Sequence, residues 1–163
     1  MKVEDNLRVA ISRAISDAAE RRHEYLTLEH VLLALLHDPD TADVIKAVGG
    51  DLKNLERDLA LYLEHEVEQL EEGKEAEPQQ TVAFGRVFQR AAIHVQSSGK
   101  EVLTGPAVLL ALTREEDSYA VYLLEEQGVK RLDITSFLSH GTRKDGLVSR
   151  RPARAGAGAD DSD

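Results

Sequence analysis

The chain has 163 residues, of which 42% are hydrophobic and 4% aromatic, and it contains neither cysteine nor tryptophan. This length suffices for one domain with its own core, and the absence of cysteine excludes disulfides and thiolate metal sites. With so few aromatic residues, the core must consist of Leu, Val, Ile and Ala, which favours helices. No apolar run reaches the length of a membrane span and no signal pattern opens the chain, so we expect a cytoplasmic protein.

The formal net charge is −10. From residue 141 onward the chain has five basic and four acidic residues, so residues 1–140 carry a charge of −11. A surface of this sign repels phosphate backbones and anionic lipids. We therefore expect neither nucleic acid nor membranes as partners.

A leucine-rich segment occurs twice, at a separation of 77 residues. Residues 27–36 read TLEHVLLALL, and residues 104–112 read TGPAVLLAL, so five consecutive positions are identical. Arg13 and Arg90 are also identical at this separation. The pattern indicates one helical unit used twice.

Apolar spacing and capping signals predict four helices in the first unit, over about residues 3–22, 27–36, 41–48 and 51–63. Thr27 is the expected N-cap of the second helix, where its hydroxyl accepts from the amide of residue 29 or 30. Seven of the fourteen residues 64–77 are acidic, which is typical of a solvated connector. Four further helices are expected over about residues 81–97, 104–112, 117–127 and 131–139.

The predicted fold class is therefore all-α, a pseudo-twofold tandem repeat of two four-helix units with about eight helices. The units span about residues 3–66 and 80–140, within a domain of residues 1–140. Residues 141–163 have almost no side chain large enough to bury, so we expect a flexible linker to a module that this chain lacks.

The repeated motif T-x-E-H-x-L-L-A-L-L resembles the N-terminal domain of the Clp ATPases. Three stretches are similar to the ClpA branch of that family: RRHEYLTLEH at 21–30, HVQSSG at 94–99 and SHGTRKD at 139–145. The resemblance implies a tether to a ring-forming ATPase hexamer that feeds the ClpP peptidase. It also implies binding of the ClpS adaptor, which delivers protein substrates bearing N-degrons.

The sequence has no G-x-x-x-x-G-K-[ST] motif, so ATP belongs to the implied full-length protein and no cofactor is expected here. A ClpC-type reader of phosphorylated arginine is an alternative, because ClpC relatives use a Glu two positions after each repeat's Thr. Glu29 fits this position in the first unit, but Pro106 occupies it in the second.

A small metal-dependent hydrolase is a third hypothesis, because His23-Glu24 is similar to the start of a zinc-protease motif. That motif needs a second His three positions after the Glu, where this chain has Thr27. An opportunistic metal held by His23 with Glu64 or His65 is left open. We expect no catalytic residues and no metal site.

The expected functional feature is a docking surface made of polar residues on the first connector and on the opening helix of the second unit. These residues are His23, Glu24, Glu29, Arg86, Arg90 and His94. The last three recur every four residues, so they share one helix face, and Arg is favoured at interfaces. For Arg90, an intramolecular salt bridge is an equally weighted alternative.

Overall fold

The structure, a computed structural model, describes residues 1–141 and 143, so nearly all of the predicted linker lies outside the described residues. The first unit consists of β1 (Lys2–Val3), α1 (Asp5–Glu20), β2 (Tyr25–Leu26), α2 (Leu28–Leu35), α3 (Pro39–Ala47) and α4 (Leu52–His65). The second consists of β3 (Gln79–Gln80), α5 (Val82–Ser97), β4 (Val102–Leu103), α6 (Gly105–Leu112), α7 (Tyr119–Glu126) and α8 (Arg131–His140). The eight helices confirm the predicted fold class, whereas the short strands were not predicted.

The repeat of the sequence is also a repeat of the structure. The elements β1, α1, β2 and α2 each begin and end 77 residues before β3, α5, β4 and α6. Thr27 is the N-cap of α2, as predicted, and Thr104 is the N-cap of α6. At Thr27 the imidazole of His30 completes a capping box, because its Nδ1 accepts from the Thr27 amide at 3.0 Å.

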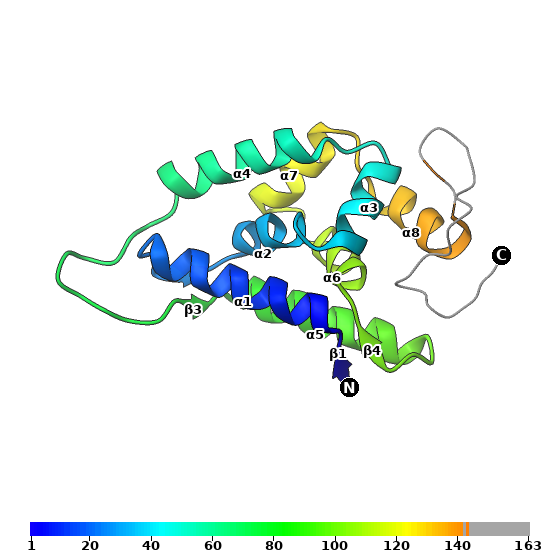
Figure 1. Cartoon of the computed structure of the whole chain (residues 1–163), viewed down its shortest axis with the longest axis horizontal. Helices are drawn as coiled ribbons and strands as arrows, with labels where there is room; N and C mark the ends of the chain where they lie inside the picture. Colours follow the sequence, from blue (N-terminus) through cyan, green and yellow to red (C-terminus); the bar gives the residue numbers. More distant parts are fainter. Residues whose placement is uncertain (142, 144–163) are drawn as a thin grey trace.

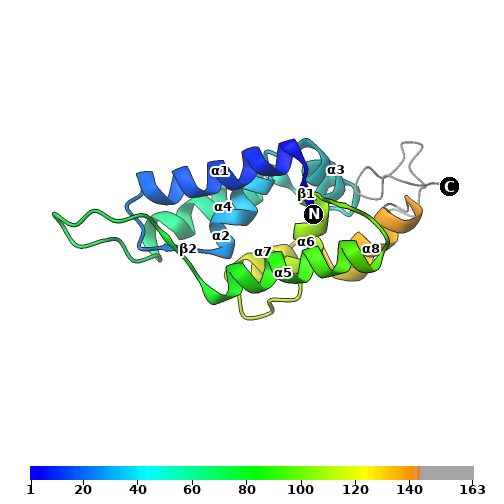
Figure 2. The ribbon, with the colours of Figure 1, turned by 90° about the horizontal axis from the view of Figure 1, so that it is seen from below.

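The two units exchange contacts with each other. Strand β1 pairs in parallel with β4, and β2 pairs in parallel with β3, so each unit's first strand joins the other unit's second strand. Helix α2 contacts α6 and α7, and α6 contacts α3. Figure 2 shows α1 and α5 on opposite sides of the molecule with α2 and α6 between them, whereas in the view of Figure 1 the two long helices overlap.

The core is built from the repeated leucines. Leu32, Leu35, Leu109 and Leu112 are all buried to within 1% of complete. Burying each such side chain contributes about 1.5–3 kcal/mol relative to exposure. Both near-identical segments therefore lie at the centre of one shared core. No helix in the described part of the chain is long and apolar enough to cross a membrane.

The acidic segment between the units is irregular and mostly exposed, but Arg22 attaches its beginning to the end of α1. Arg22 has a left-handed backbone (φ 59°), where the equivalent residue of the second unit is Gly99 (φ 77°). A non-glycine residue in this conformation costs about 1–2 kcal/mol. In return, its guanidinium donates to the carbonyl oxygens of Leu70, Glu71 and Lys74 at 3.3, 3.1 and 2.7 Å.

Close packing of α6 on α3 requires a glycine at the start of α6. A Cβ on Gly105 would lie 2.3 Å from both Asp38 Oδ2 and Thr41 Oγ1, which are hydrogen-bonded to each other at the start of α3. Both side chains are buried. They cannot move aside without losing that hydrogen bond.

We expect Gly105→Ala to lower the free energy of unfolding by about 1–3 kcal/mol through overpacking. Urea unfolding followed by circular dichroism measures this change. The control is Gly85→Ala within α5, where an added Cβ meets no atom within 4 Å. That substitution should be neutral or stabilising by about 0.5–1 kcal/mol. Equal destabilisation by both variants would contradict the packing argument.

Candidate docking grooves

Two grooves occupy equivalent positions in the two units. The first lies between α1, α2 and α4 and has a volume of about 370 Å³. The second lies between α5, α6 and α8 and has a volume of about 420 Å³. At the repeat separation, Arg13 of the first groove corresponds to Arg90 of the second. The chemistry of most other positions differs.

The second groove combines cationic and apolar side chains and has no carboxylate in its lining, and we call it the basic groove. It is lined by Arg90, His94, Ser98, Ala107, Leu110, Ala111, Arg114, Arg131, Leu132, Thr135, Leu138 and Ser139. Arg114 and Arg131 are exposed and have no ion pair within the described residues. Leu132 at the rim is 74% exposed. The groove can therefore hold an anionic group beside an apolar one.

Glu115 fixes the arginines at the edge of the basic groove. Arg86 forms a bidentate pair with it, at 2.6 and 2.8 Å, and Arg90 donates to the same carboxylate at 3.0 Å. The hydrogen bond from Arg86 lowers the pKa of the Glu115 carboxyl, burial opposes this, and the bond from Arg90 adds to the lowering. The salt-bridge alternative for Arg90 is thus correct, and the pair also orients Arg90 where it lines the groove.

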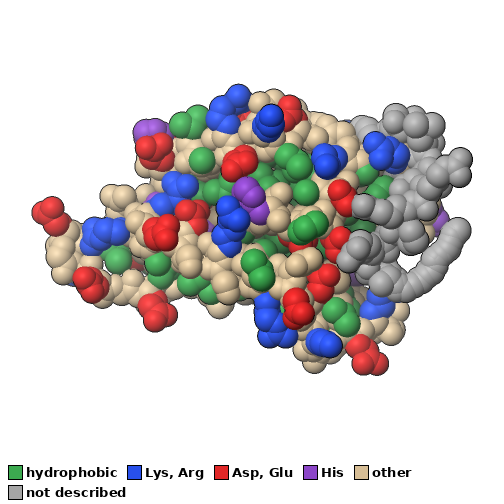
Figure 3. All heavy atoms as spheres, viewed as in Figure 1, with side chains coloured by type: hydrophobic (Ala, Val, Ile, Leu, Met, Phe, Trp, Pro, Cys, Tyr) green, Lys and Arg blue, Asp and Glu red, His purple; other side chains and the backbone are tan. Residues whose placement is uncertain are grey.

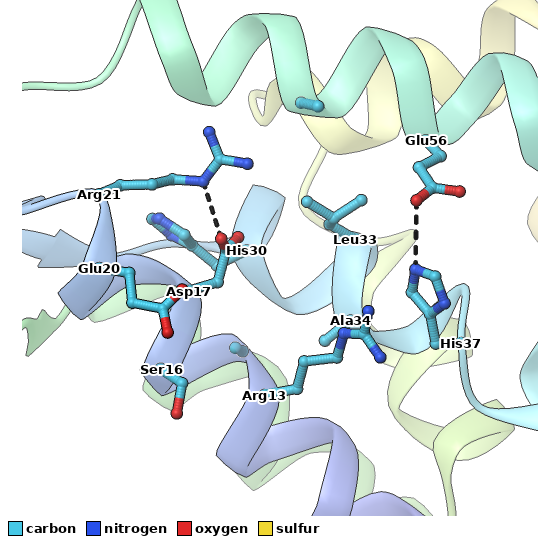
Figure 4. A pocket seen from close by; sticks show the side chains of 12 residues that line it. Arg13, Ser16, Asp17, Glu20, Arg21, His30, Leu33, Ala34, His37 and Glu56 are labelled. Atoms are coloured by element: carbon cyan, nitrogen blue, oxygen red, sulfur yellow. Dashed lines mark hydrogen bonds and ion pairs between the residues drawn. The ribbon is translucent and has the colours of Figure 1, made fainter.

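The first groove carries charges of both signs, and we call it the mixed-charge groove. Asp17 pairs with Arg21 at 2.9 Å across one turn of α1, and His37 lies 3.4 Å from Glu56 of α4 (Figure 4). Figure 3 shows acidic and basic side chains interspersed over this face. Because arginines and carboxylates both line it, the mixed-charge groove is a weaker site for a partner of single charge.

His23, predicted to face a partner, is buried instead. It is 1% exposed, and its Nδ1 lies 2.8 Å from Nε2 of the buried His30. Since the Thr27 amide can only donate, His30 Nδ1 accepts, and His30 Nε2 carries the proton that it donates to His23. Burial lowers the pKa of His30 to about 4 and also lowers that of His23.

Glu29 is also buried, at 6% exposure, and it connects the two units. Its Oε2 accepts from the amide of Ala120 at 2.9 Å, in the first turn of α7. A carboxylate is stabilised there by the free amides and the helix dipole. The expectation that His23 and Glu29 belong to an exposed docking surface is therefore corrected, because both make hydrogen bonds within the interior.

The other four predicted residues are placed at the surface or at its edge. Glu24 is exposed beside β3, which leads into α5, and Arg86, Arg90 and His94 lie along α5 itself. Of these four residues, Arg90 and His94 line the basic groove. Within residues 1–141 and 143, no group of three or more acidic and histidine side chains is arranged to hold a metal ion.

Sequence reasoning missed Arg114 and Arg131, which complete the basic groove from α6's end and from α8. A signal for Arg114 was present, because it follows the repeated helix at the position where His37 follows it in the first unit. Arg131 had no such signal. It opens a helix whose packing against α6 is set by the tertiary fold.

The described part of the chain is a helical tandem repeat with two grooves at equivalent positions. The model of the family described as the Clp repeat (R) N-terminal domain matches residues 2–127. The chain belongs to this family, the N-terminal domain of the Clp ATPases.

Relatives and solved structures agree with this assignment. A ClpA homolog protein from Fuscovulum blasticum is 48% identical over 142 residues, which cover 85% of this chain and 18% of that protein. The chaperone protein ClpB of Mesorhizobium japonicum is 28% identical, over 78% of this chain and 15% of its own length. The chain thus spans less than a fifth of these relatives.

Among solved structures, the Hsp104 N-terminal domain from Candida albicans matches with a TM-score of 0.74 and 18% identity, covering 88% of this chain and 95% of that one. The ClpV N-domain in complex with a VipB peptide matches with a TM-score of 0.69 and 24% identity, covering 85% of each chain. These likenesses show the shared fold.

The buried histidine pair predicts a loss of stability in mild acid. Well above pH 6.5, His30 is neutral in both the folded and the unfolded chain. As the pH falls toward about 4, the unfolded chain binds a proton at His30 while the folded chain keeps the ring neutral. The free energy of unfolding should fall over this window by up to about 3 kcal/mol. Histidine NMR titration measures the pKa directly, and urea unfolding at several pH values measures the loss.

A His30 ring that titrates near pH 6.5 in the folded protein would contradict the hydrogen-bond chain from Thr27 to His23.

Proposed function

We propose that this chain is the N-terminal docking domain of a ClpA-type unfoldase. It binds the ClpS adaptor and thereby recruits N-degron substrates for ATP-dependent degradation with ClpP. The observation that carries this proposal is the basic groove, whose three arginines and three leucines form a concave cationic and apolar surface on a chain of net charge −10. The likeness to a ClpA homolog supports the choice of branch.

The mechanism we propose is local concentration, with no chemistry in this domain. An adaptor loaded with substrate binds the basic groove while the chain beyond the domain tethers it to the ATPase ring. A short flexible tether gives an effective concentration on the order of millimolar, so modest affinity suffices. The ion pairs of Arg86 and Arg90 with Glu115 hold the groove edge in place before binding, which reduces the entropy lost on docking.

The alternatives find less support. A phosphoarginine reader of the ClpC type needs an accessible Glu29, yet its carboxylate is buried and accepts from Ala120. Pro106, at the equivalent position, is buried as well. A metal-dependent hydrolase needs a ligand cluster, and His23 points to His30 in the interior.

We expect purified ClpS to bind the chain in isothermal titration calorimetry and Arg114→Glu to weaken the affinity about tenfold or more, equivalent to about 1.4 kcal/mol. Arg114 is exposed and makes no ion pair within the described residues, so its reversal should leave the fold intact. Arg13→Glu makes the same charge change in the mixed-charge groove and should leave the affinity unchanged.

Two outcomes would count against the proposal. A titration without heat or saturation would exclude the adaptor as the partner. Equal loss of affinity in Arg114→Glu and Arg13→Glu would show that net charge, rather than the basic groove, determines binding.

A further inference from the structure

Three tyrosines from both units form a stack on a surface that neither groove includes. The ring centroids of Tyr62 on α4 and Tyr119 on α7 are 4.2 Å apart with planes 11° from parallel. Tyr122 continues the stack at 5.4 Å from Tyr119 and is 51% exposed. The stacked pair Tyr62 and Tyr119 packs α4 against α7. The outer ring stays available to a partner.

Two carboxylates share a helix face with the first tyrosine of this stack. Asp58, Tyr62 and Glu66 follow one another at intervals of four residues from α4 into its C-cap, so they share a face. Burial is the main cause that raises the pKa of Tyr119, and the negative charge of Asp58 raises it further. Burial is also the main cause that raises the pKa of Tyr62, with Glu29 and Glu66 adding to it.

The negative charges of Asp58 and Glu66 are not fully neutralised by cationic side chains among the described residues. In the part of the chain that the structure describes, Asp58 forms its one ion pair with Arg57, its neighbour in sequence, at 3.3 Å, and that arginine is 63% exposed. Glu66 is exposed and has no ion pair within the described residues. Aromatic faces attract cations, and nearby carboxylates add to that attraction. The surface therefore complements positive charge.

We propose that the tyrosine stack, with Asp58 and Glu66, is a docking surface for a cationic, unstructured segment of a partner protein, which places an Arg or Lys side chain over the ring of Tyr122. The guanidinium of Arg suits the site best, because it is planar, stacks on aromatic faces and is weakly hydrated. The domain's negative field steers such segments toward the surface. This site shares no residue with the basic groove, so it stands or falls independently of adaptor binding.

Tyrosine fluorescence reports on the site directly, because the chain has no tryptophan and three of its four tyrosines belong to the stack. The probe is a short Gly/Ser peptide that carries several arginines, titrated into the full chain. We expect a saturable change in tyrosine emission that weakens as salt is added. The same peptide with Gln in place of each Arg should give no saturable change.

Four variants locate the binding. Tyr122→Ala should weaken the arginine peptide about fivefold, the size of an exposed cation–π contact, while Tyr122→Phe should keep the affinity. Glu66→Gln should weaken it, and Glu75→Gln, in the exposed acidic segment, should not. Thermal unfolding confirms that each variant folds, and calorimetry replaces fluorescence where a tyrosine is lost.

Unchanged affinity in Tyr122→Ala, or equal binding of the Gln peptide, would overturn the proposal. The chain itself carries Arg150, Arg151 and Arg154. If replacing these three with Ala changes the tyrosine emission in the absence of peptide, the occupant is the chain's own segment, and the assignment to a partner protein is wrong.

Discussion

The packing of α2 against α6 at the centre of the molecule is the interaction on which the other contacts depend. Each of these helices is buried by its own unit and by the other one, through α7 and α3 respectively. Neither unit can therefore close its core alone. The exchanged strand pairs and the Glu29 bond to α7 secure the same interface from its edges.

The two units have the same arrangement of helices around the shared core, but the side chains that line their grooves differ. The grooves between α1, α2 and α4 and between α5, α6 and α8 have equivalent positions, and Arg13 and Arg90 occupy the same place in each. In one groove Asp17 pairs with Arg21 within the lining. In the other, Glu115 lies outside the lining and orients Arg90, which lines the groove. The two grooves thus differ in charge, and the basic groove combines cationic and apolar side chains.

Buried polar groups explain why the first connector is a structural part of the domain. His23, His30 and the Thr27 amide form a chain of neutral hydrogen bonds, which satisfies the start of α2 and joins it to the end of α1. Arg22, next to His23, donates hydrogen bonds to three carbonyl oxygens of the acidic segment and so attaches that segment to the end of α1. The polar side chains of this connector make hydrogen bonds within the domain. The exposed polar side chains that remain available to a partner lie on α5, on α8 and on the face formed by α4 and α7.

The sequence alone determined the eight helices of the described residues, the N-cap Thr27 and the doubling of the unit, because periodicity and capping are local properties of a sequence. The start of α3 was expected about two residues too late, because Asp38 is its N-cap and Pro39 its first residue. The sequence also placed Arg86, Arg90 and His94 on one helix face. Only the tertiary structure decided that Glu29 and His23 are interior, that Arg114 and Arg131 join Arg90 in one groove, and that Tyr62 stacks on Tyr119. Burial and long-range pairing depend on how the second unit closes on the first, and no local pattern records that geometry.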